Sequence, residues 1–377
     1  MATRQSHNPH PSDRSSSARV VTQHSSKTSR LQVANLQTVL KGTAIQNVTM
    51  LTTKAGWAYS RQDVWSISEA GRTWDAVWHH TVPILAFAAP STTDAWIVTV
   101  KVGARHCEVW HTSDGGRTWH SATVQTGWQV LTASVAVAGN GQGHVLLSGD
   151  PATMTAPQML VNIKNSHVET RPAFSTKSGG LSDIVFPTVR DGVAVDQAVA
   201  GAQNITAPLF RSTNGGATWQ PILLPASPHI AASANDKGGA SYVVVNPVTF
   251  VTPSIGYLTL ANPAALLYRT TNAGASWSPI HTPPVTTGYG IASAWLTPQM
   301  GWVMAGNKGP SVLWGTANGG KTWTRLSADN FVSMPQFSSA RIGWALVIPT
   351  HSNAYGGPET FVRTTNGGRT WSPIKIR

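Results

Sequence analysis

The sequence predicts an all-β protein, a seven-bladed β-propeller built from four-stranded antiparallel blades. The first observation behind this prediction is a seven-residue box that occurs six times and always ends in tryptophan. The copies are SEAGRTW (68–74), SDGGRTW (113–119), TNGGATW (213–219), TNAGASW (271–277), ANGGKTW (317–323) and TNGGRTW (365–371). Successive boxes lie 45, 100, 58, 46 and 48 residues apart, and the gap of 100 is two periods with one copy missing. A repeat of this length made of short β-type segments is typical of a radially repeated sheet.

A second repeat gives the number of blades. In each unit a small residue, usually glycine, precedes a short apolar strand. The seven copies begin at Gly56-Trp57, Ala95-Trp96, Gly143-His144, Gly192-Val193, Gly256-Tyr257, Gly301-Trp302 and Gly343-Trp344. The third copy belongs to a unit without a box, which fills the long gap. Both repeats therefore indicate seven blades.

The elements are expected in the following order along the chain. Residues 1–30 are rich in Ser, His and Arg and have no apolar run, so they should form a disordered basic tail. Residues 31–44 are a lead-in segment, and the propeller occupies 45–377. Its blades are expected at 45–80, 81–127, 128–175, 180–225, 240–283, 288–327 and 331–377. The longest insertion, 224–241, explains the wide spacing between blades 4 and 5.

The boxes are interpreted as structural. Their Asp or Asn can accept hydrogen bonds from backbone N–H groups a few residues on, and their glycines can adopt positive φ. Their tryptophan has a large apolar face to bury against the neighbouring sheet. The residues assigned to this role are Asp114, Asn214, Asn272, Asn318, Asn366, Trp74, Trp119, Trp219, Trp277, Trp323 and Trp371. Function is therefore sought outside the boxes.

The pattern S/T-x-D/N-x-G-x-T/S-W resembles the Asp-box, or BNR, repeat of sialidases, xyloglucan-active hydrolases, sortilin-type receptors and photosystem II assembly and stability factors. The fuller pattern RTTNGGRTW (363–371) after an apolar strand is most similar to that last, non-enzymatic group, and the sialidase superfamily is a more distant likeness. The resemblance covers about residues 45–377. It implies a propeller that docks a protein through a basic patch, although unrelated activities share this fold.

Composition indicates a protein with few charges and an excess of basic ones. Only 11% of residues are charged, against a usual figure of about 25%, and the net charge is +12. This favours an extracytoplasmic or secreted protein whose signal or anchor is not visible in this chain, with a cytoplasmic protein as the alternative. Cys107 is the only cysteine, so no intramolecular disulfide can form, and a buried apolar role is expected. No cofactor, metal site or specific nucleic acid partner is predicted, and a monomer is expected.

Binding is expected on one face of the ring. With the strands of a blade labelled A to D from axis to rim, the A–B turns share a face with the boxes between C and D. The B–C loops and D–A connections are longer and irregular, and such loops on a rigid scaffold commonly carry function. The residues predicted there to contact a partner are Arg61, Lys101, Arg105, Arg171, Lys177, Trp128 and Tyr289. The expected partner is a protein, acidic or membrane-proximal.

The alternative is a carbohydrate-active propeller, either a glycoside hydrolase or a glycan-binding protein. A hydrolase usually needs two carboxylates on opposite sides of the sugar. If the chain is an enzyme, the candidates are Asp183, which begins an innermost strand, and Asp63. No early Arg-Ile-Pro-type motif of sialidases is present, and a xyloglucanase-like cleft would need a second propeller. The sequence therefore favours a non-catalytic scaffold.

Overall fold

The computed structural model describes the chain from residue 45 onward, with several internal gaps. The described residues are 45–150, 157–164, 167–172, 181–196, 209–225, 243–244, 248–261, 265–285, 291–306, 310–348 and 359–376. The chain divides into a unit Met1–Gln32 and a unit Val33–Arg377, and the described residues belong to the second. The predicted tail (1–30), the lead-in (31–44) and most of the 224–241 insertion lie outside them.

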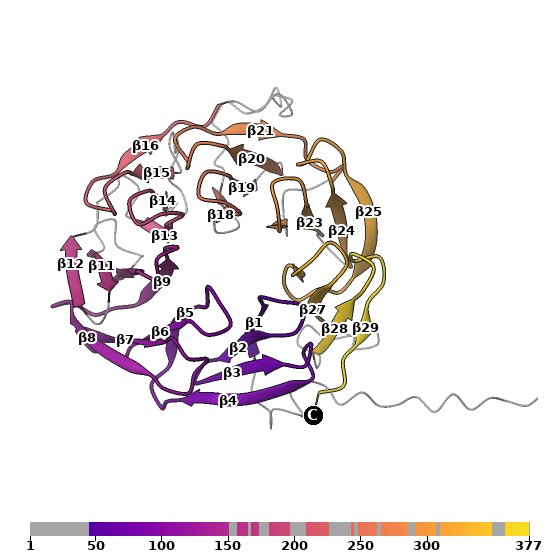
Figure 1. The fold of residues 1–377 in the computed structure, drawn as a ribbon. Helices are drawn as coiled ribbons and strands as arrows, with labels where there is room; N and C mark the ends of the chain where they lie inside the picture. Colours follow the sequence, from indigo (N-terminus) through magenta and orange to yellow (C-terminus); the bar gives the residue numbers. More distant parts are fainter. Residues whose placement is uncertain are drawn as a thin grey trace, which may run out of the picture. The chain divides into compact units, whose positions relative to one another are not determined.

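Seven antiparallel sheets form a ring, and the predicted seven-bladed propeller of four-stranded blades is confirmed (Figure 1). Blade 1 contains β1 (Ile45–Met50), β2 (Gly56–Ser60), β3 (Asp63–Ser68) and β4 (Thr73–His79). Blade 2 contains β5 (Ile84–Ala88), β6 (Ala95–Thr99), β7 (His106–Thr112) and β8 (His120–Gln125). Blade 3 contains β9 (Thr132–Val137), β10 (Gly143–Ser148), β11 (Gln158–Lys164) and β12 (His167–Pro172). Blade 4 contains β13 (Leu181–Val185), β14 (Gly192–Asp196), β15 (Leu209–Ser212) and β16 (Gln220–Ile222).

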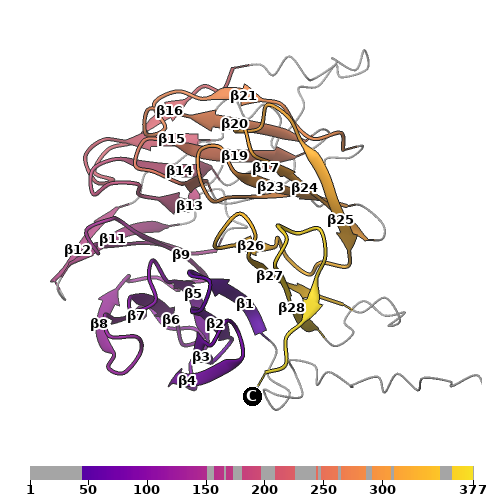
Figure 2. The ribbon, with the colours of Figure 1, turned by 45° about the vertical axis from the view of Figure 1, so that its right-hand side comes forward.

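The remaining blades follow the same order. Blade 5 has a first strand in two pieces, β17 (Val243–Val244) and β18 (Thr249–Phe250), both paired with β19 (Gly256–Ala261), then β20 (Leu266–Thr270) and β21 (Ser278–Ile280). Blade 6 contains β22 (Ala292–Trp295), β23 (Gly301–Ala305), β24 (Ser311–Thr316) and β25 (Thr324–Asp329). Blade 7 contains β26 (Gln336–Phe337), β27 (Gly343–Val347), β28 (Thr360–Thr364) and β29 (Ser372–Pro373). Figure 2 shows β4, β8, β12, β16 and β25 on the outer side of their blades. Within the described residues, no helix has the length and apolar character needed to cross a membrane.

The second strand of each blade carries most of the core. β6, β10, β23 and β27 are buried along their whole length, which matches their near-continuous apolar sequence. The glycine that starts such a strand is needed for close approach. A Cβ atom on Gly143 would lie 2.8 Å from the Trp96 ring of the preceding blade. Apolar residues of adjacent blades therefore pack directly against each other.

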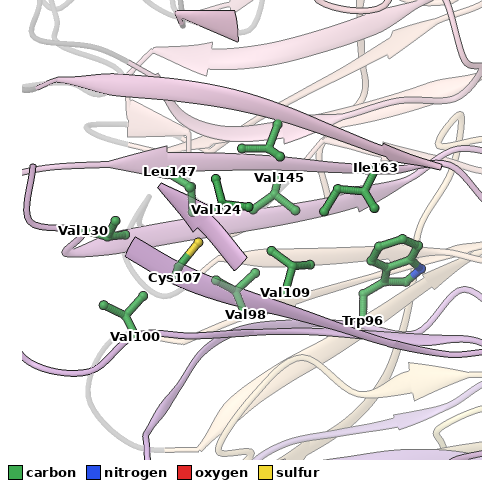
Figure 3. Packing of buried hydrophobic residues seen from close by; sticks show 11 residues of the cluster. Trp96, Val98, Val100, Cys107, Val109, Val124, Val130, Val145, Leu147 and Ile163 are labelled. Atoms are coloured by element: carbon green, nitrogen blue, oxygen red, sulfur yellow. The ribbon is translucent and has the colours of Figure 1, made fainter. Parts of the chain in front are cut away.

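The layer between blades 2 and 3 shows this packing (Figure 3). Val98 and Val109 of blade 2 face Val145 and Leu147 of blade 3, and the Cys107 thiol lies among them. Cys107 is 1% exposed, and burial raises its pKa to about 12. The expected buried apolar role of this cysteine is confirmed.

Five of the six box turns, which join the third and fourth strands of their blades, share one hydrogen-bond network. In blade 2, Asp114 Oδ1 accepts from the Thr118 backbone N–H (2.9 Å), and Thr118 Oγ1 donates to Asp114 Oδ2 (2.7 Å). The Gly116 N–H donates to Thr112 Oγ1 (3.0 Å). Hydrogen bonds from Thr118 hold the pKa of Asp114 well below its usual range. The two bonds from backbone N–H groups recur around Asn214, Asn272, Asn318 and Asn366, where the asparagine Nδ2 donates to the Thr or Ser hydroxyl instead of accepting from it.

The box turn of blade 1 is built differently. Glu69 and Ala70 have positive φ values of 50° and 60°, as does Gly71 at 95°. The Ala70 N–H donates to the Lys54 carbonyl oxygen of the A–B turn (2.9 Å) as in the other boxes, but the Gly71 N–H donates to the Ser68 carbonyl oxygen (3.0 Å) and not to a side-chain hydroxyl. The change follows from Glu69, which stands where the other boxes have Asp or Asn.

One box residue offers a direct test of backbone strain. Ala273 has a φ of 56°, whereas glycine occupies the equivalent position in the other four turns of this type. Because the left-handed region costs a residue with a Cβ about 1–2 kcal/mol, Ala273→Gly is expected to raise the free energy of unfolding by about 1 kcal/mol. Urea denaturation checks this. Ala275→Gly in the same turn is the control and should not stabilise, since Ala275 has no positive φ.

The ring closes by side-chain packing between blades 7 and 1. All four described strands of blade 7 come from its own stretch of chain, so no strand from the other end completes it. Trp344 Nε1 donates to the Ala70 carbonyl oxygen (3.4 Å), and the Met50 N–H donates to Gln336 Oε1 (3.2 Å). The Trp74 and Phe361 rings meet edge to face at 5.6 Å. The seam is therefore an apolar and hydrogen-bonded contact.

Blade 3 carries a buried histidine where blades 1 and 2 have Trp57 and Trp96. His144 is fully buried and stacks on Phe186 with ring centroids 3.7 Å apart. Its Nδ1 lies 2.8 Å from Asn162 Oδ1, and its Nε2 has no hydrogen-bond partner. Burial lowers the pKa of His144 from 6.5 to about 4, although the Asn162 hydrogen bond acts in the opposite direction.

This histidine should make folding stability depend on pH. Below pH 6.5 the unfolded chain binds a proton at His144 that the folded chain does not, so stability falls as pH is lowered. The loss attributable to His144 should reach about 3 kcal/mol at pH 4. Urea denaturation of the wild type and of His144→Phe at pH 7 and pH 4 isolates this contribution. Equal losses in both proteins would contradict the assignment.

Candidate functional site

The two faces of the ring are fixed by backbone hydrogen bonds. The Gly115 N–H of a box turn donates to the Thr93 carbonyl oxygen of the A–B turn (2.9 Å). The equivalent bond joins Gly367 to Arg341 in blade 7, also at 2.9 Å. We call the face formed by box turns and A–B turns the box face, and the opposite side, formed by B–C loops and D–A connections, the irregular face.

Exposed basic residues gather on the box face. They stand in A–B turns, in boxes and just after the last box: Lys54, Arg72, Arg117, Arg190, Lys321, Arg341, Arg369 and Lys375. A second set, Arg211, Arg269 and Arg363, is half-buried one residue before the box-turn residues. Arg211 shows how this set is held, because it donates to Asp191 Oδ1 (3.0 Å) and to the Ala273 carbonyl oxygen of the next blade (3.2 Å).

The described box turns and A–B turns carry four carboxylates; three are engaged within the protein, and the fourth, Glu69 of the blade 1 box, is exposed. Asp94 accepts from Trp96 Nε1 (3.0 Å) and lies 3.3 Å from His111 Nε2. Asp114 is bonded within its own box, and Asp191 pairs with Arg211. The box face therefore presents more free positive charge than negative charge.

The densest part of this charge lies at the seam between blades 7 and 1. A hollow of about 350 Å³ is lined by Arg72, Arg363 and Lys375, together with hydroxyl-bearing residues Thr365, Thr370 and Ser372. Within the part of the chain that the structure describes, no carboxylate lines it. The Arg363 guanidinium lies over the Trp344 ring, 5.6 Å from its centroid, and its Nε has no hydrogen-bond partner.

A second hollow shares one wall with the first. Thr365 also lines a hollow of about 520 Å³ together with Arg341, whose Nε donates to the Thr365 carbonyl oxygen (3.2 Å). Arg369 stands exposed in the same box. We call Arg72, Arg341, Arg363, Arg369 and Lys375 the seam patch.

The irregular face is not basic over its described residues. Arg61, Lys101 and Arg105 are exposed there as predicted. The same loops and strand ends carry five carboxylates, namely Asp63, Asp150, Asp196, Asp329 and Glu359. Over the described residues, these five carboxylates outnumber Arg61, Lys101 and Arg105, so the described part of this face is slightly acidic.

Other residues predicted to contact a partner lie elsewhere or are not described. Arg171 does not lie in a connection on the irregular face but within β12 on the outer side of blade 3. It pairs there with Glu169 (2.6 Å), and it lines a hollow of about 320 Å³ with Arg190 and Asn214 of the box face. Trp128 is half-buried and packs against the core cluster between blades 2 and 3. Lys177 and Tyr289 lie outside the described residues.

The two carboxylates proposed for an enzyme are not brought together. Asp183 lines a pocket of about 470 Å³ between the innermost strands β5, β9 and β13, and none of the other described lining residues is a carboxylate. Asp63 accepts from Ser60 Oγ (2.9 Å) and pairs with His79 Nδ1 (2.7 Å) in blade 1. The Asp63 carboxylate therefore makes its contacts within blade 1. Within the described residues, no group of three or more His, Cys, Asp or Glu is placed to hold a metal ion.

The sequence contained a signal for the seam patch. The last box and the residues on either side of it hold Arg363, Arg369 and Lys375 within thirteen residues. Arg72, by contrast, lies in the first box, at the other end of the propeller sequence. Only the closed ring brings these residues to one place.

Comparison with known proteins supports the fold. No protein-family model and no curated protein matches the chain. A solved structure described as "YCF48 bound to D1 peptide" is similar, with a TM-score of 0.54 and 15% identity over 86% of this chain and 92% of that one. The GH74 xyloglucanase from Xanthomonas campestris gives a TM-score of 0.53 and 15% identity over 89% of this chain, which spans 53% of the enzyme. An oligogalacturonate lyase from Vibrio parahaemolyticus gives 0.61 and 9% identity, covering 87% of this chain and 92% of that one.

These likenesses show the β-propeller fold alone, because all identities are low. The similar structures include both a peptide-bound protein and enzymes. The residues of this chain must therefore decide between a peptide-binding and an enzymatic function.

Proposed function

We propose that this chain is a non-catalytic docking scaffold that holds an acidic segment of a partner protein against its box face, centred on the seam patch. The observation that carries the proposal is the charge of that surface. Arg72, Arg363 and Lys375 line one hollow, and no carboxylate lines it among the described residues. The proposed docking surface therefore lies on the box face. The sequence placed it on the irregular face, where Arg61, Lys101 and Arg105 stand among carboxylates.

The geometry of the seam patch suits a carboxylate-rich segment. Arginine presents a planar fork of donors that can bind a carboxylate through two parallel hydrogen bonds. The turns that carry these side chains are fixed by backbone bonds such as Gly367 N–H to the Arg341 carbonyl oxygen (2.9 Å). A surface ordered before binding loses less conformational entropy on association. Its positive charge also raises the rate of encounter with an acidic partner.

The fold comparison is consistent with this function. A propeller of the same fold is described as bound to a peptide, which supports a protein partner for this chain. An extracytoplasmic or membrane-proximal partner fits the low charge content and the basic face. A carbohydrate-active protein has less support, because a hydrolase needs paired carboxylates about 5–10 Å apart. Here Asp183 lines the axial pocket while Asp63 is bound to Ser60 and His79.

The proposal predicts that charge removal on one face, and not the other, weakens binding. The probe is a fluorescein-labelled octaglutamate peptide, with octaglutamine as the uncharged control, and the readout is fluorescence anisotropy. The seam variant carries Arg72→Gln, Arg369→Gln and Lys375→Gln. The matched variant carries Arg61→Gln, Lys101→Gln and Arg105→Gln on the irregular face, with the same change in net charge.

We expect the seam variant to bind octaglutamate about tenfold more weakly, since each exposed ion pair contributes up to about 1 kcal/mol. The irregular-face variant should bind within about twofold of the wild type. Its altered charges lie on the opposite face, and salt largely screens interactions between exposed charges that are farther apart than a Debye length. Equal losses in both variants, or a larger loss in the irregular-face variant, would refute docking at the seam.

A further inference from the structure

The pocket on the axis of the ring differs chemically from the rest of the surface. Its volume of about 470 Å³ lies in the range of small-molecule sites. Residues of the innermost strands β5, β9 and β13 line it, together with Tyr59 and Val248. Among the residues that the structure describes, no Lys, Arg or His lines it, although the chain has a net charge of +12. The one charged group among these described lining residues is the Asp183 carboxylate.

The hydrogen bonds of Asp183 leave one oxygen available. Oδ1 accepts from the Ile184 backbone N–H (2.9 Å) and from Ser134 Oγ. Oδ2 makes no hydrogen bond to the described residues. Burial raises the pKa of this carboxyl, and the hydrogen bonds from Ser134 and Ile184 oppose the shift. A cation placed beside Oδ2 would compensate its negative charge.

Two aromatic rings complete the site. Tyr59 and Phe87 both line the pocket and stack on each other with ring centroids 4.9 Å apart. The face of an aromatic ring attracts an ammonium group, and pairs of rings are a recurrent means of binding methylated ammonium ions. Leu85 and Val135 add apolar surface to the same wall. The pocket thus offers one anion, two aromatic rings and apolar contacts, which fit a cation whose charge is covered by carbon.

We propose that the axial pocket binds a small organic ammonium ion, whose charged head lies beside Asp183 Oδ2 and whose methyl groups contact Tyr59 and Phe87. Nothing in this site is shared with the seam patch, so its ligand is independent of the proposed docking function. The pocket lies between the inner strands of blades 2, 3 and 4, and the seam patch lies between blades 7 and 1.

Isothermal titration calorimetry with choline tests the proposal. The uncharged isostere 3,3-dimethylbutan-1-ol has the same carbon skeleton without the positive charge, and sodium chloride at matched concentration controls for ionic strength. We expect saturable binding of choline and binding of the alcohol at least tenfold weaker. Equal binding of choline and the alcohol, or no saturable binding of choline, would overturn the proposal.

Substitutions locate the binding in the pocket. Asp183→Asn keeps an oxygen that accepts from Ser134 and Ile184 but removes the charge, so choline affinity should fall at least tenfold. Phe87→Leu should lower it severalfold through loss of the aromatic face. Asp75→Asn is the matched control, because Asp75 is exposed on β4 and its loss changes net charge equally. Thermal melting of each variant shows that it is folded, and wild-type affinity in Asp183→Asn would exclude this site.

Discussion

Replacing Trp219 by alanine is expected to lower the free energy of unfolding by about 3–5 kcal/mol. Trp219 is 7% exposed and belongs to a core cluster that joins blades 3 and 4, with Leu160 and Phe210 among its members. Its ring meets Phe186 edge to face, with centroids 5.9 Å apart. The substitution removes the largest side chain of that layer and leaves a cavity lined by rigid strands.

The equivalent tryptophan of another blade provides the comparison. Trp323 ends the box of blade 6, is only partly buried, and donates through Nε1 to the His281 carbonyl oxygen (2.8 Å). Trp323→Ala should therefore destabilise the protein less than Trp219→Ala. Urea denaturation followed by tryptophan fluorescence and circular dichroism measures both. An unchanged stability of Trp219→Ala would show that the box tryptophans do not hold the blades together.

The second large effect is expected at Gly216, the last glycine of the blade 4 box. Its φ is +85°, and a Cβ atom there would overlap Leu160 Cδ2 of blade 3. Gly216→Ala should cost about 1–2 kcal/mol for the left-handed backbone and about 1–3 kcal/mol more for overpacking. The same close approach occurs at Gly116 against Val77 and at Gly320 against Ile280, in each case a residue of the preceding blade.

Gly115→Ala separates the two contributions. Gly115 has a similar φ of +78°, but its nearest neighbour, the Thr92 carbonyl oxygen, lies at 3.7 Å, so only the backbone cost of about 1–2 kcal/mol should remain. In a Leu160→Ala background, Gly216→Ala should cost less than in the wild type, because the overlapping methyl group is gone. A cost for Gly216→Ala no greater than that for Gly115→Ala would contradict close packing of boxes on the preceding blade.

Sequence reasoning could predict the fold because the information in a propeller is periodic. The small residue that begins each second strand recurs in all seven blades, and the box before the fourth strand recurs in six of them. The missing box of blade 3 and the long spacing before blade 5 do not disturb the count, because the two signals are independent. Packing of adjacent blades then follows from the same residues that mark the repeat.

The candidate sites were less accessible to sequence reasoning because they depend on contacts across the ring. Arg72 and Lys375 meet only because blade 7 closes on blade 1. The Arg171 side chain donates to Glu169, two residues earlier on β12. The spacing of residues in the sequence does not show in which direction a side chain points. Asp183 was recognised as an axial residue, but its aromatic neighbours Tyr59 and Phe87 come from other blades.

The position of the docking surface is tested most directly by hydrogen–deuterium exchange of the protein with and without bound octaglutamate. Docking at the seam patch predicts slower exchange in the A–B turns at 51–55 and 338–342 and in the segment 365–376 that follows β28. The irregular-face segments 61–62, 100–105 and 126–131 should exchange at unchanged rates. Protection of those irregular-face segments with unchanged exchange at the seam would contradict the proposed docking surface.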